Sequence, residues 1–330
     1  MKRARVALTA LALLLPVDAQ AQPGMWQRAR QPGAVQRAHA RLRAEQLFEA
    51  ATGARSDVEV FRDLSLGSAA SLELGGGARS DPWQSVLLGR VLLDAQAGRE
   101  QEAMQLIQRG LAQLPASDFK RESYFDLGLG ALISSDFSLA ERAFTAALSL
   151  AWDSDYRASI HRNRGKVRML VGDLTRAVSD FRAAVRLARG TEVVALSHFG
   201  LGVALDRSGD FPQGLMEVAR GVAIRLPVPP YPSESVLDLP NLRWVPEYDV
   251  HYFRALSFMA EATVADTPEL QETGYLMALS QWDEYLPAAE ARKDRFVANA
   301  HRHRRRCAAA IDGLSSRLAP RKKPGSSSIR

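Results

Sequence analysis

Residues 123–150 read SYFDLGLGALISSDFSLAERAFTAALSL, and a related pattern returns at 160–187 as IHRNRGKVRMLVGDLTRAVSDFRAAVRL and at 196–224 as LSHFGLGVALDRSGDFPQGLMEVARGVAI. Gly128, Gly165 and Gly202 set the phase of these copies, because they are 37 residues apart. Four further positions keep this spacing: an aspartate, a small residue, a bulky apolar residue and a second small residue. They are Asp136, Asp173 and Asp210; Ala140, Ala177 and Gly214; Phe144, Phe181 and Val218; and Ala147, Ala184 and Gly221.

Each copy predicts two helices joined by a short turn. The glycine lets the second helix approach the first closely, and the aspartate accepts the unpaired N–H groups at the start of the second helix. The small, bulky and small residues are spaced by four and three, so they share one helix face. A single hairpin of this kind cannot bury its apolar face alone, so the units must stack. The sequence therefore predicts an all-α solenoid of helix–turn–helix repeats.

This pattern resembles the tetratricopeptide repeat in the glycine of the first helix, the glycine before the second, and the small–bulky–small series. A fourth copy precedes the others, although Arg99 stands where they have aspartate. Its matching positions are Gly89, Gly98, Ala103, Ile107, Gly110 and Pro115. The family repeat has about 34 residues, so the extra residues here fall in the turns between units. The resemblance implies a curved array that binds another protein or an extended peptide in its concave groove.

Outside the repeats the pattern is less regular. We expect a signal peptide at 1–21, an N-terminal helical or low-pattern region at 22–80 and four repeats at 81–226. A proline-rich strap at 227–246, an irregular repeat at 247–287, a capping helix at 288–318 and a disordered basic tail at 319–330 follow. Prolines exclude helix through most of the strap. Its aromatic residues, Tyr231 and Trp244, favour an extended segment lying on the array.

The irregular repeat predicts a helix at 247–264 and a second helix that starts at Pro268. Asp266 or Thr267 would cap this second helix. A final helix is expected from about 288 to 312, ending at Gly313. Cys307, the only cysteine in the sequence, is expected to be buried in an apolar stripe, and no intramolecular disulfide is available.

The first residues predict export. A basic start is followed by an apolar run at 6–15 and by Ala19-Gln20-Ala21, the pattern of a cleavable signal peptide. We therefore expect cleavage near Ala21 and a periplasmic or secreted protein of a bacterium. No other stretch reaches the roughly 18 apolar residues of a membrane span. Charge is uneven, because 22–290 holds 28 basic and 34 acidic residues whereas 291–330 holds 12 basic and 2 acidic.

No catalytic spacing is found in the sequence, so we expect neither an enzyme nor a cofactor. His301, His303 and Cys307 raise the question of a metal site, but the neighbouring arginines would repel a cation, and a solvated basic helix face is favoured. An active site under the strap, built from Asp238, Glu247, Asp249 and His251, is a lesser alternative.

The resemblance implies that positions three before and one after each helix glycine face the inner groove. These positions are Phe125, Leu129, Arg162, Lys166, Phe199 and Val203. They lie around a basic run that comprises Arg157, His161, Arg162, Arg164, Lys166 and Arg168. A cationic centre between apolar flanks suits an extended peptide or the acidic or C-terminal end of a partner.

This region allows two other interpretations. The basic run would be an ordinary charged helix surface if its charges were satisfied by Asp153, Asp155, Asp173 or Asp180. The carboxylate-clamp version of the family is not expected. Asn163 occupies its asparagine position, but Phe125, Leu129, Leu196 and Gly200 fill the flanking basic and asparagine positions.

The sequence thus predicts a non-enzymatic protein–protein interaction scaffold in the cell envelope or the secreted space. The alternative is binding of an anionic envelope polymer or lipid through the basic residues of 291–330. Export argues against nucleic acid as the ligand of that basic segment.

Overall fold

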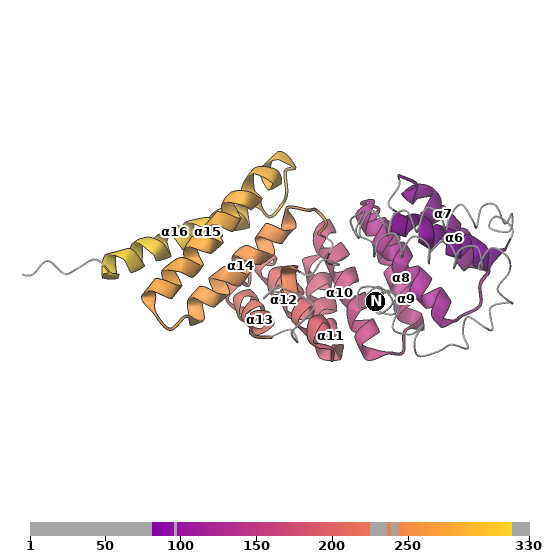
Figure 1. Cartoon of the computed structure of the whole chain (residues 1–330), viewed down its shortest axis with the longest axis horizontal. Coiled ribbons are helices and arrows are strands. Elements are labelled where there is room, and N and C mark those ends of the chain that lie inside the picture. Colours follow the sequence, from indigo (N-terminus) through magenta and orange to yellow (C-terminus); the bar gives the residue numbers. More distant parts are fainter. Residues whose placement is uncertain (1–80, 96–97, 225–235, 239–241, 243, 319–330) are drawn as a thin grey trace, which may run out of the picture. The chain divides into compact units, whose positions relative to one another are not determined.

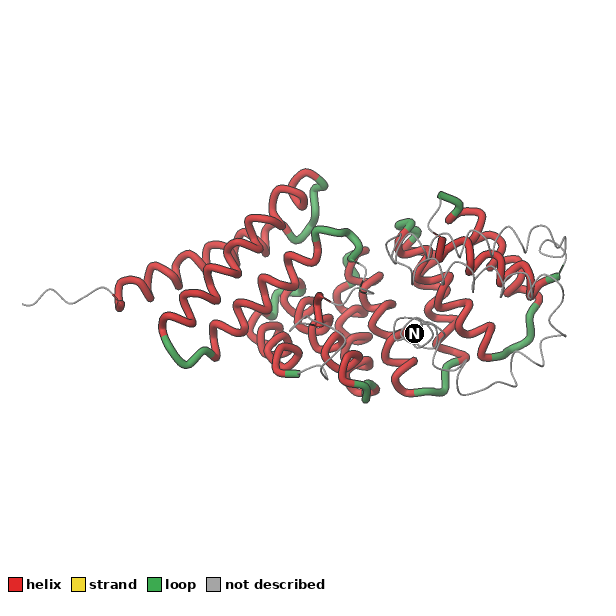
Figure 2. The backbone as a smooth tube through the Cα atoms, viewed as in Figure 1, coloured by secondary structure: helices red, strands yellow, loops and turns green. Residues whose placement is uncertain are grey.

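The computed structural model describes residues 81–95, 98–224, 236–238, 242 and 244–318. Over these residues the regular structure is helical and contains no strand (Figure 2). The all-α prediction is therefore confirmed for the described part of the chain. Two compact units are present, Met1–Leu150 and Ala151–Arg330, and each is treated by itself below.

The first unit contains two helical hairpins whose helices pack against one another in chain order (Figure 1). Its helices are α6 (Pro82–Ala95), α7 (Glu100–Gln113), α8 (Asp118–Ile133) and α9 (Phe137–Leu150). Within each hairpin the two helices make the most extensive contacts, and α6 also contacts α8. Consecutive hairpins therefore stack within this unit, as a helical repeat requires.

The second unit contains two regular hairpins, followed along the chain by a 3-10 turn and three longer helices. Its elements are α10 (Ser154–Val171), α11 (Leu174–Leu187), α12 (Thr191–Arg207), α13 (Phe211–Ala223), the 3-10 turn η1 (Val236–Asp238), α14 (Asp249–Val264), α15 (Pro268–Ala291) and α16 (Val297–Leu318). Each helix again packs on its successor, while η1 lies against both α12 and α14. A large hydrophobic core joins helices α10 to α16 of this unit, and a smaller cluster lies between α10 and α11.

The glycine of each first helix allows the second helix of the same hairpin to pack closely against it. A methyl group added at Gly128 would lie 2.6 Å from the Phe144 ring, and one added at Gly202 would lie 2.6 Å from Val218 Cγ2. Gly165 faces Phe181 in the same way. The bulky residue of each second helix therefore fills the space that the glycine leaves open. This part of the prediction is confirmed.

The recurring aspartates cap the second helices as predicted. The side chains of Asp136, Asp173 and Asp210 accept hydrogen bonds from backbone N–H groups three residues on, at 3.0, 3.0 and 3.3 Å. Arg99, which stands at this position in the earliest hairpin, makes no such cap.

Two predictions for the irregular repeat are confirmed. Its first helix is α14, and its second helix, α15, starts at Pro268 with Thr267 as the capping residue. The Thr267 hydroxyl accepts from the Leu270 N–H at 3.3 Å. Proline suits the first turn because its missing N–H would have no partner there.

The predicted start and end of the last helix are wrong. Helix α15 continues past Pro287 to Ala291, and α16 begins only at Val297 and runs through Gly313 to Leu318. The break lies at Lys293, whose φ of 54° is left-handed, and at Asp294, whose carboxylate accepts from the Phe296 N–H at 2.8 Å. Neither residue type is a strong helix breaker, which is why the sequence places this boundary poorly. Cys307 is buried, as predicted.

Several predictions fall on residues outside the described part of the chain: the signal peptide at 1–21, the region at 22–80, Tyr231 and most of the strap, and the tail at 319–330. Among the described helices, none combines the length and the apolar character needed to cross a membrane.

Candidate binding site in the second unit

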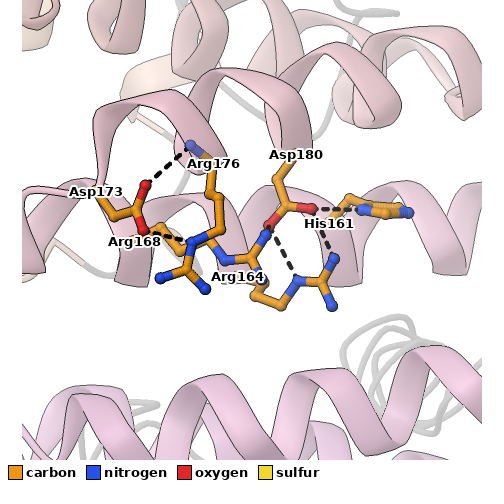
Figure 3. A network of polar contacts seen from close by, with 6 residues as sticks. All are labelled: His161, Arg164, Arg168, Asp173, Arg176 and Asp180. Carbon is orange, nitrogen blue, oxygen red and sulfur yellow. Dashed lines mark hydrogen bonds and ion pairs between the residues drawn. The ribbon is translucent and has the colours of Figure 1, made fainter.

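The basic residues of α10 divide between two faces of the helix. On one face, His161 Nδ1 lies 2.8 Å from Asp180 Oδ1, Arg164 donates to the same carboxylate at 2.8 and 3.0 Å, and Arg168 donates to it at 2.7 Å (Figure 3). Asp180 lies on α11 and is buried. Half of the basic run is therefore a structural contact between α10 and α11, which is the ordinary interpretation of that run.

The protonation of Asp180 reflects these partners. Burial raises the pKa of its carboxyl. The hydrogen bonds from His161 and Arg164 and the charges of Arg164 and Arg168 lower this pKa by more, so the net shift is downward. The other three acidic residues that were expected to pair with the basic run accept hydrogen bonds at helix N-termini. Asp153 and Asp173 cap α10 and α11, and Asp155 accepts from the Gly190 N–H at the start of α12.

The same kind of contact recurs one repeat later. His198 Nδ1 lies 2.7 Å from Glu217 Oε2, and both residues follow His161 and Asp180 by 37 positions. Within each of the hairpins α10–α11 and α12–α13, a histidine on the first helix thus contacts a carboxylate on the second at the same register position. The 37-residue spacing of the two pairs is visible in the sequence.

The opposite face of α10 carries the two predicted groove cations, Arg162 and Lys166. Both are partly buried. Burial lowers the pKa of the Arg162 guanidinium, and the charge of Glu192 opposes that shift. Burial also lowers the pKa of the Lys166 ammonium, to about 8. The desolvation of two cations on one face is costly, because an ion in a low-dielectric site loses its hydration.

Charges of both signs act on Lys166. Asp249 raises the pKa of Lys166, whereas Arg162 and Arg207 lower it. Asp249 is itself engaged in an ion pair with Arg207, in which both side chains are only 1% exposed. Arg162, Lys166 and Arg207 thus lie near one another, with Asp249 near Lys166 and Arg207 and with Glu192 near Arg162.

Arg207 is held by more than its ion pair. Its guanidinium carbon lies 4.4 Å from the centre of the Tyr252 ring and 4.2 Å from that of Phe296. Burial lowers the pKa of Arg207, but the charge of Asp249 and the surrounding tyrosines outweigh this and raise it. The pair joins the end of α12 to the start of α14.

Trp244, predicted as a strap aromatic, lies at this site. The Lys166 ammonium is 5.6 Å from the centre of its ring. The same ring packs edge-on against Phe253 of α14, with 4.9 Å between the ring centres. Val236 and Leu237 of η1 are buried in the core that also contains Val203. The described residues of the strap thus lie on α10, α12 and α14.

The predicted apolar flanks have different environments. Val203 is 0% and Phe199 2% exposed. Phe199 faces the α13 glycine Gly221, so these two side chains are core residues. Phe125 and Leu129 belong to the first unit, where both are partly buried and Phe125 packs edge-on against Phe144 at 5.7 Å.

A second polar network was missed by the sequence analysis. Asp206 accepts a hydrogen bond from the Tyr252 hydroxyl at 2.5 Å and lies 2.8 Å from His303 Nε2. Asn299 donates to the Asp206 backbone carbonyl at 3.2 Å. His303 is 2% exposed, so the expectation of a solvated basic face is wrong at this residue. The contact between His303 and Asp206 joins α16 to α12.

The signal for this network was present in the repeat register. The positions equivalent to Asp206 and Arg207 in the preceding repeat are Met169 and Leu170. Two charged residues therefore replace two apolar residues at the end of an otherwise apolar helix. Since buried charges require partners, this replacement could have indicated a contact with a distant segment.

The residues of the two minor alternatives have other partners. The two histidines of the metal alternative contact different acids: His301 Nε2 lies 2.8 Å from Glu290 Oε1, and His303 contacts Asp206. Within the described residues, no group of three or more histidine, cysteine or acidic side chains is placed to hold a metal ion. Of the acidic and histidine residues near the strap, Asp249 is bound by Arg207 and His251 Nδ1 lies 3.0 Å from Gln281.

Part of the basic charge of α16 is also used within the chain. Arg304 pairs with Asp283 at 2.6 Å, and the Arg306 guanidinium carbon lies 4.3 Å from the centre of the Phe211 ring. Arg305 is exposed. The rest of the predicted basic tail, 319–330, lies outside the described residues.

Comparison with known proteins supplies no family: no protein-family model matches the chain, and no curated protein matches it.

Proposed function

We propose that this chain is an exported, non-enzymatic binding protein of the tetratricopeptide type, which holds an extended acidic segment of a partner protein against Arg162 and Lys166. The repeat register, the glycine contacts and the aspartate caps of the described hairpins support the repeat type. The predicted signal at 1–21 supports export. The partner would contact the second unit on the face of α10 that is turned away from Asp180.

The position of the predicted groove cations carries this proposal: Arg162 and Lys166 lie on one face of α10, and Arg207 lies near Lys166. Asp249 also lies near Lys166 and is paired with Arg207, and Glu192 lies near Arg162. A carboxylate that enters such a site forms charge-assisted hydrogen bonds and offsets the repulsion between the cations. Bonds of this kind contribute about 1.5–3 kcal/mol each. An acidic side chain or a free C-terminus therefore fits this face better than a neutral or basic ligand.

A peptide library tests this proposal. Random peptides of mixed composition would be selected on the mature chain, and the selected peptides titrated by fluorescence anisotropy with free and with amidated C-termini. Acidic residues or a free C-terminus should be enriched. The double variant Arg162→Glu/Lys166→Glu should weaken binding by about 30-fold or more, because truncating one partner of a buried charge pair costs about 2–5 kcal/mol.

The matched control is Arg182→Glu/Arg186→Glu. These two arginines have the same spacing on α11 and are exposed, so the variant makes the same change in net charge away from the site. Its affinity should stay within about twofold of that of the parent chain. Equal losses in both double variants would show that net charge alone attracts the peptides, and unchanged binding in the α10 variant would reject the site.

The pH dependence gives a second measurement. Because the pKa of Lys166 in the chain without peptide is about 8, a bound carboxylate should raise this pKa, and the complex should take up a fraction of a proton from the buffer near that pH. Calorimetry in buffers with different ionisation enthalpies measures this uptake. Affinity should fall as the pH rises from about 8, the pKa of Lys166 in the chain without peptide, to the higher pKa of Lys166 in the complex, and Lys166→Gln should abolish both effects.

A further inference from the structure

The basic run of α16 has a different environment from that of α10. In α10, three basic side chains meet on the buried carboxylate of Asp180. Helix α16 instead packs on α15 (Figure 1). Residues 291–318 hold eight basic and two acidic residues, and all eight basic side chains are exposed. The groups around these side chains decide how much of their charge is compensated within the chain.

The two acidic residues of this segment compensate little of the charge. Asp294 accepts hydrogen bonds from the Tyr248 hydroxyl at 2.9 Å and from the Phe296 N–H at 2.8 Å. Asp312 lies six residues beyond Arg306, which is about 9 Å along the helix axis. One carboxylate therefore serves the start of α16, and the other lies well past the basic run.

Helix α15 supplies carboxylates to one side of α16. Asp283 pairs with Arg304 at 2.6 Å, and Glu290 Oε1 lies 2.8 Å from His301 Nε2. Residues two apart on a helix point in different directions, because each residue turns the helix by about 100°. The arginines that stand two positions before and two positions after Arg304 are therefore turned away from this ion pair.

Six other cations lie in the turn before α16 or in the first ten residues of the helix. Arg302 donates to an asparagine side chain at 2.7 Å, and Arg295 donates to a backbone carbonyl at 2.8 Å. The guanidinium carbons of Arg292 and Arg306 lie 5.6 and 4.3 Å from the centres of aromatic rings, and Arg306 also donates to a histidine nitrogen at 3.3 Å. These contacts hold the side chains without bringing a negative charge to them. We call the six residues the α16 basic surface: Arg292, Lys293, Arg295, Arg302, Arg305 and Arg306.

The composition of this surface limits the kind of ligand. A guanidinium presents its N–H groups in a planar fork that fits the oxygens of a phosphate group. From Val297 to Arg306 the helix rises about 14 Å, so the six cations suit a row of phosphates better than a single one. In α16 and the turn before it, no large apolar or aromatic side chain is exposed among the described residues. A helix that lies in a membrane surface needs an apolar face, and proteins that bind single-stranded nucleic acid stack its bases on aromatic rings.

We propose that the α16 basic surface binds a linear polymer of phosphate groups that carries neither bases nor acyl chains. The polymer would run along the exposed side of α16 and replace water around the six cations. This site is separate from the face of α10 that carries Arg162 and Lys166, and it does not depend on the function proposed for that face.

The salt dependence of binding tests this inference. Long-chain inorganic polyphosphate, labelled at one end, would be titrated with the mature chain by fluorescence anisotropy. About six phosphate contacts give a slope of roughly −4 in a plot of log affinity against log salt, if the coefficient for single strands applies. Affinity should therefore fall by about 300-fold between about 50 and about 200 mM salt. Absence of binding at low salt, or binding that salt does not weaken, would overturn the inference.

A pair of charge-reversal variants locates the site. In Lys293→Glu/Arg305→Glu the two changed cations have no hydrogen bond, ion pair or ring contact within the described part of the chain, so the fold should be retained, as circular dichroism would show. The magnitude of the salt slope should fall by about two. The matched control is Arg182→Glu/Arg186→Glu on α11, whose arginines are exposed; it should keep the parent slope and an affinity within about twofold. Equal effects of both variants would overturn the inference, because net charge alone would then attract the polymer.

Three further arms separate this site and ligand from the others. Arg162→Glu/Lys166→Glu should bind polyphosphate as the control does, and a selective loss in this variant would place the polymer on α10 instead. A thymidine oligonucleotide with the same number of phosphates should bind more weakly than polyphosphate, and so should vesicles of phosphatidylcholine and phosphatidylglycerol. Equal or tighter binding of the oligonucleotide would assign the surface to nucleic acid, and equal or tighter binding of the vesicles would assign it to a membrane. Either result would overturn the inference and leave the peptide site on α10 untouched.

Discussion

The glycine in the first helix of the third clean repeat provides the sharpest test of the packing. In Gly202→Ala the new methyl group would lie 2.6 Å from Val218 Cγ2, 2.7 Å from the Gly214 carbonyl oxygen and 2.9 Å from the Val218 nitrogen. Carbon atoms make their best contacts at roughly 3.5–4.0 Å. Two of these three atoms belong to the backbone of α13, so a rotamer change cannot relieve the overlap and the helices must separate.

The magnitude follows from a comparison with Gly313, which lies inside α16 with no neighbouring atom within 4 Å of an added methyl group. Alanine is favoured over glycine in a helix by about 1 kcal/mol, so Gly313→Ala should raise the free energy of unfolding by up to that amount. The same gain applies at position 202, but overpacking there costs about 1–3 kcal/mol. The propensity term cancels between the two variants, and their difference measures the overpacking alone.

Urea and thermal unfolding followed by far-ultraviolet circular dichroism measure this difference. Gly202→Ala should be less stable than Gly313→Ala by about 1–3 kcal/mol, which is a difference of several degrees in melting temperature for a unit of this size. Gly165→Ala should fall between them, because its nearest contacts are at 3.2 Å with side-chain atoms of Asp180 and Phe181. If Gly202→Ala were as stable as Gly313→Ala, α12 and α13 would not be packed at the distance described here.

Three further predictions concern buried polar groups. The pKa of Asp180 is lowered in the folded chain by His161 and two arginines, even against the effect of burial. The stabilising contribution of Asp180 is therefore present above the unfolded pKa of about 3.9 and is lost as the pH falls through the folded value. Asp180→Asn should lower the free energy of unfolding at neutral pH and make the acid dependence of the urea midpoint shallower. Burial raises the pKa of the Cys307 thiol to about 11, so iodoacetamide should alkylate it in urea and leave it intact in buffer, as mass spectrometry would show. Arg207→Met should lower the free energy of unfolding by about 3–5 kcal/mol, because it leaves a buried carboxylate unpaired, and Asp249→Asn in the same chain should recover part of this loss.

The periodic part of the fold follows from the sequence because the interactions that build it are local. Gly165 meets Phe181 only 16 residues away, and Asp173 caps the helix that it begins. The spacing of residues close together in the sequence therefore predicts the hairpins, their helix caps and the contacts between their two helices. The face of α10 that carries Arg162 and Lys166 follows as well, since a helix places residues four apart on one side.

What could not be predicted depends on segments far apart in the chain. Spacing does not reveal that Trp244 reaches Lys166, or that His303 reaches Asp206 across 97 positions. The break between α15 and α16 was also not predicted, because Lys293 in a left-handed conformation and Asp294 as a capping residue give only weak signals in the sequence. The predicted groove residue Val203 is buried in a core that also contains Val236 and Leu237 of the strap, which come from outside the repeat.

The change from Met169 and Leu170 to Asp206 and Arg207 shows why the regular array stops where it does. In α12 these two charged side chains are buried, and their partners come from Asp249 and Tyr252 on α14 and from His303 on α16. A further copy of the regular repeat in that place would bring apolar residues to these positions and leave both charges without partners. Burying an unpaired charge costs far more than an apolar contact gains. The polar pair therefore selects the irregular α14–α16 segment over another regular unit, and the same choice places the strap, which joins α13 to α14, beside Lys166.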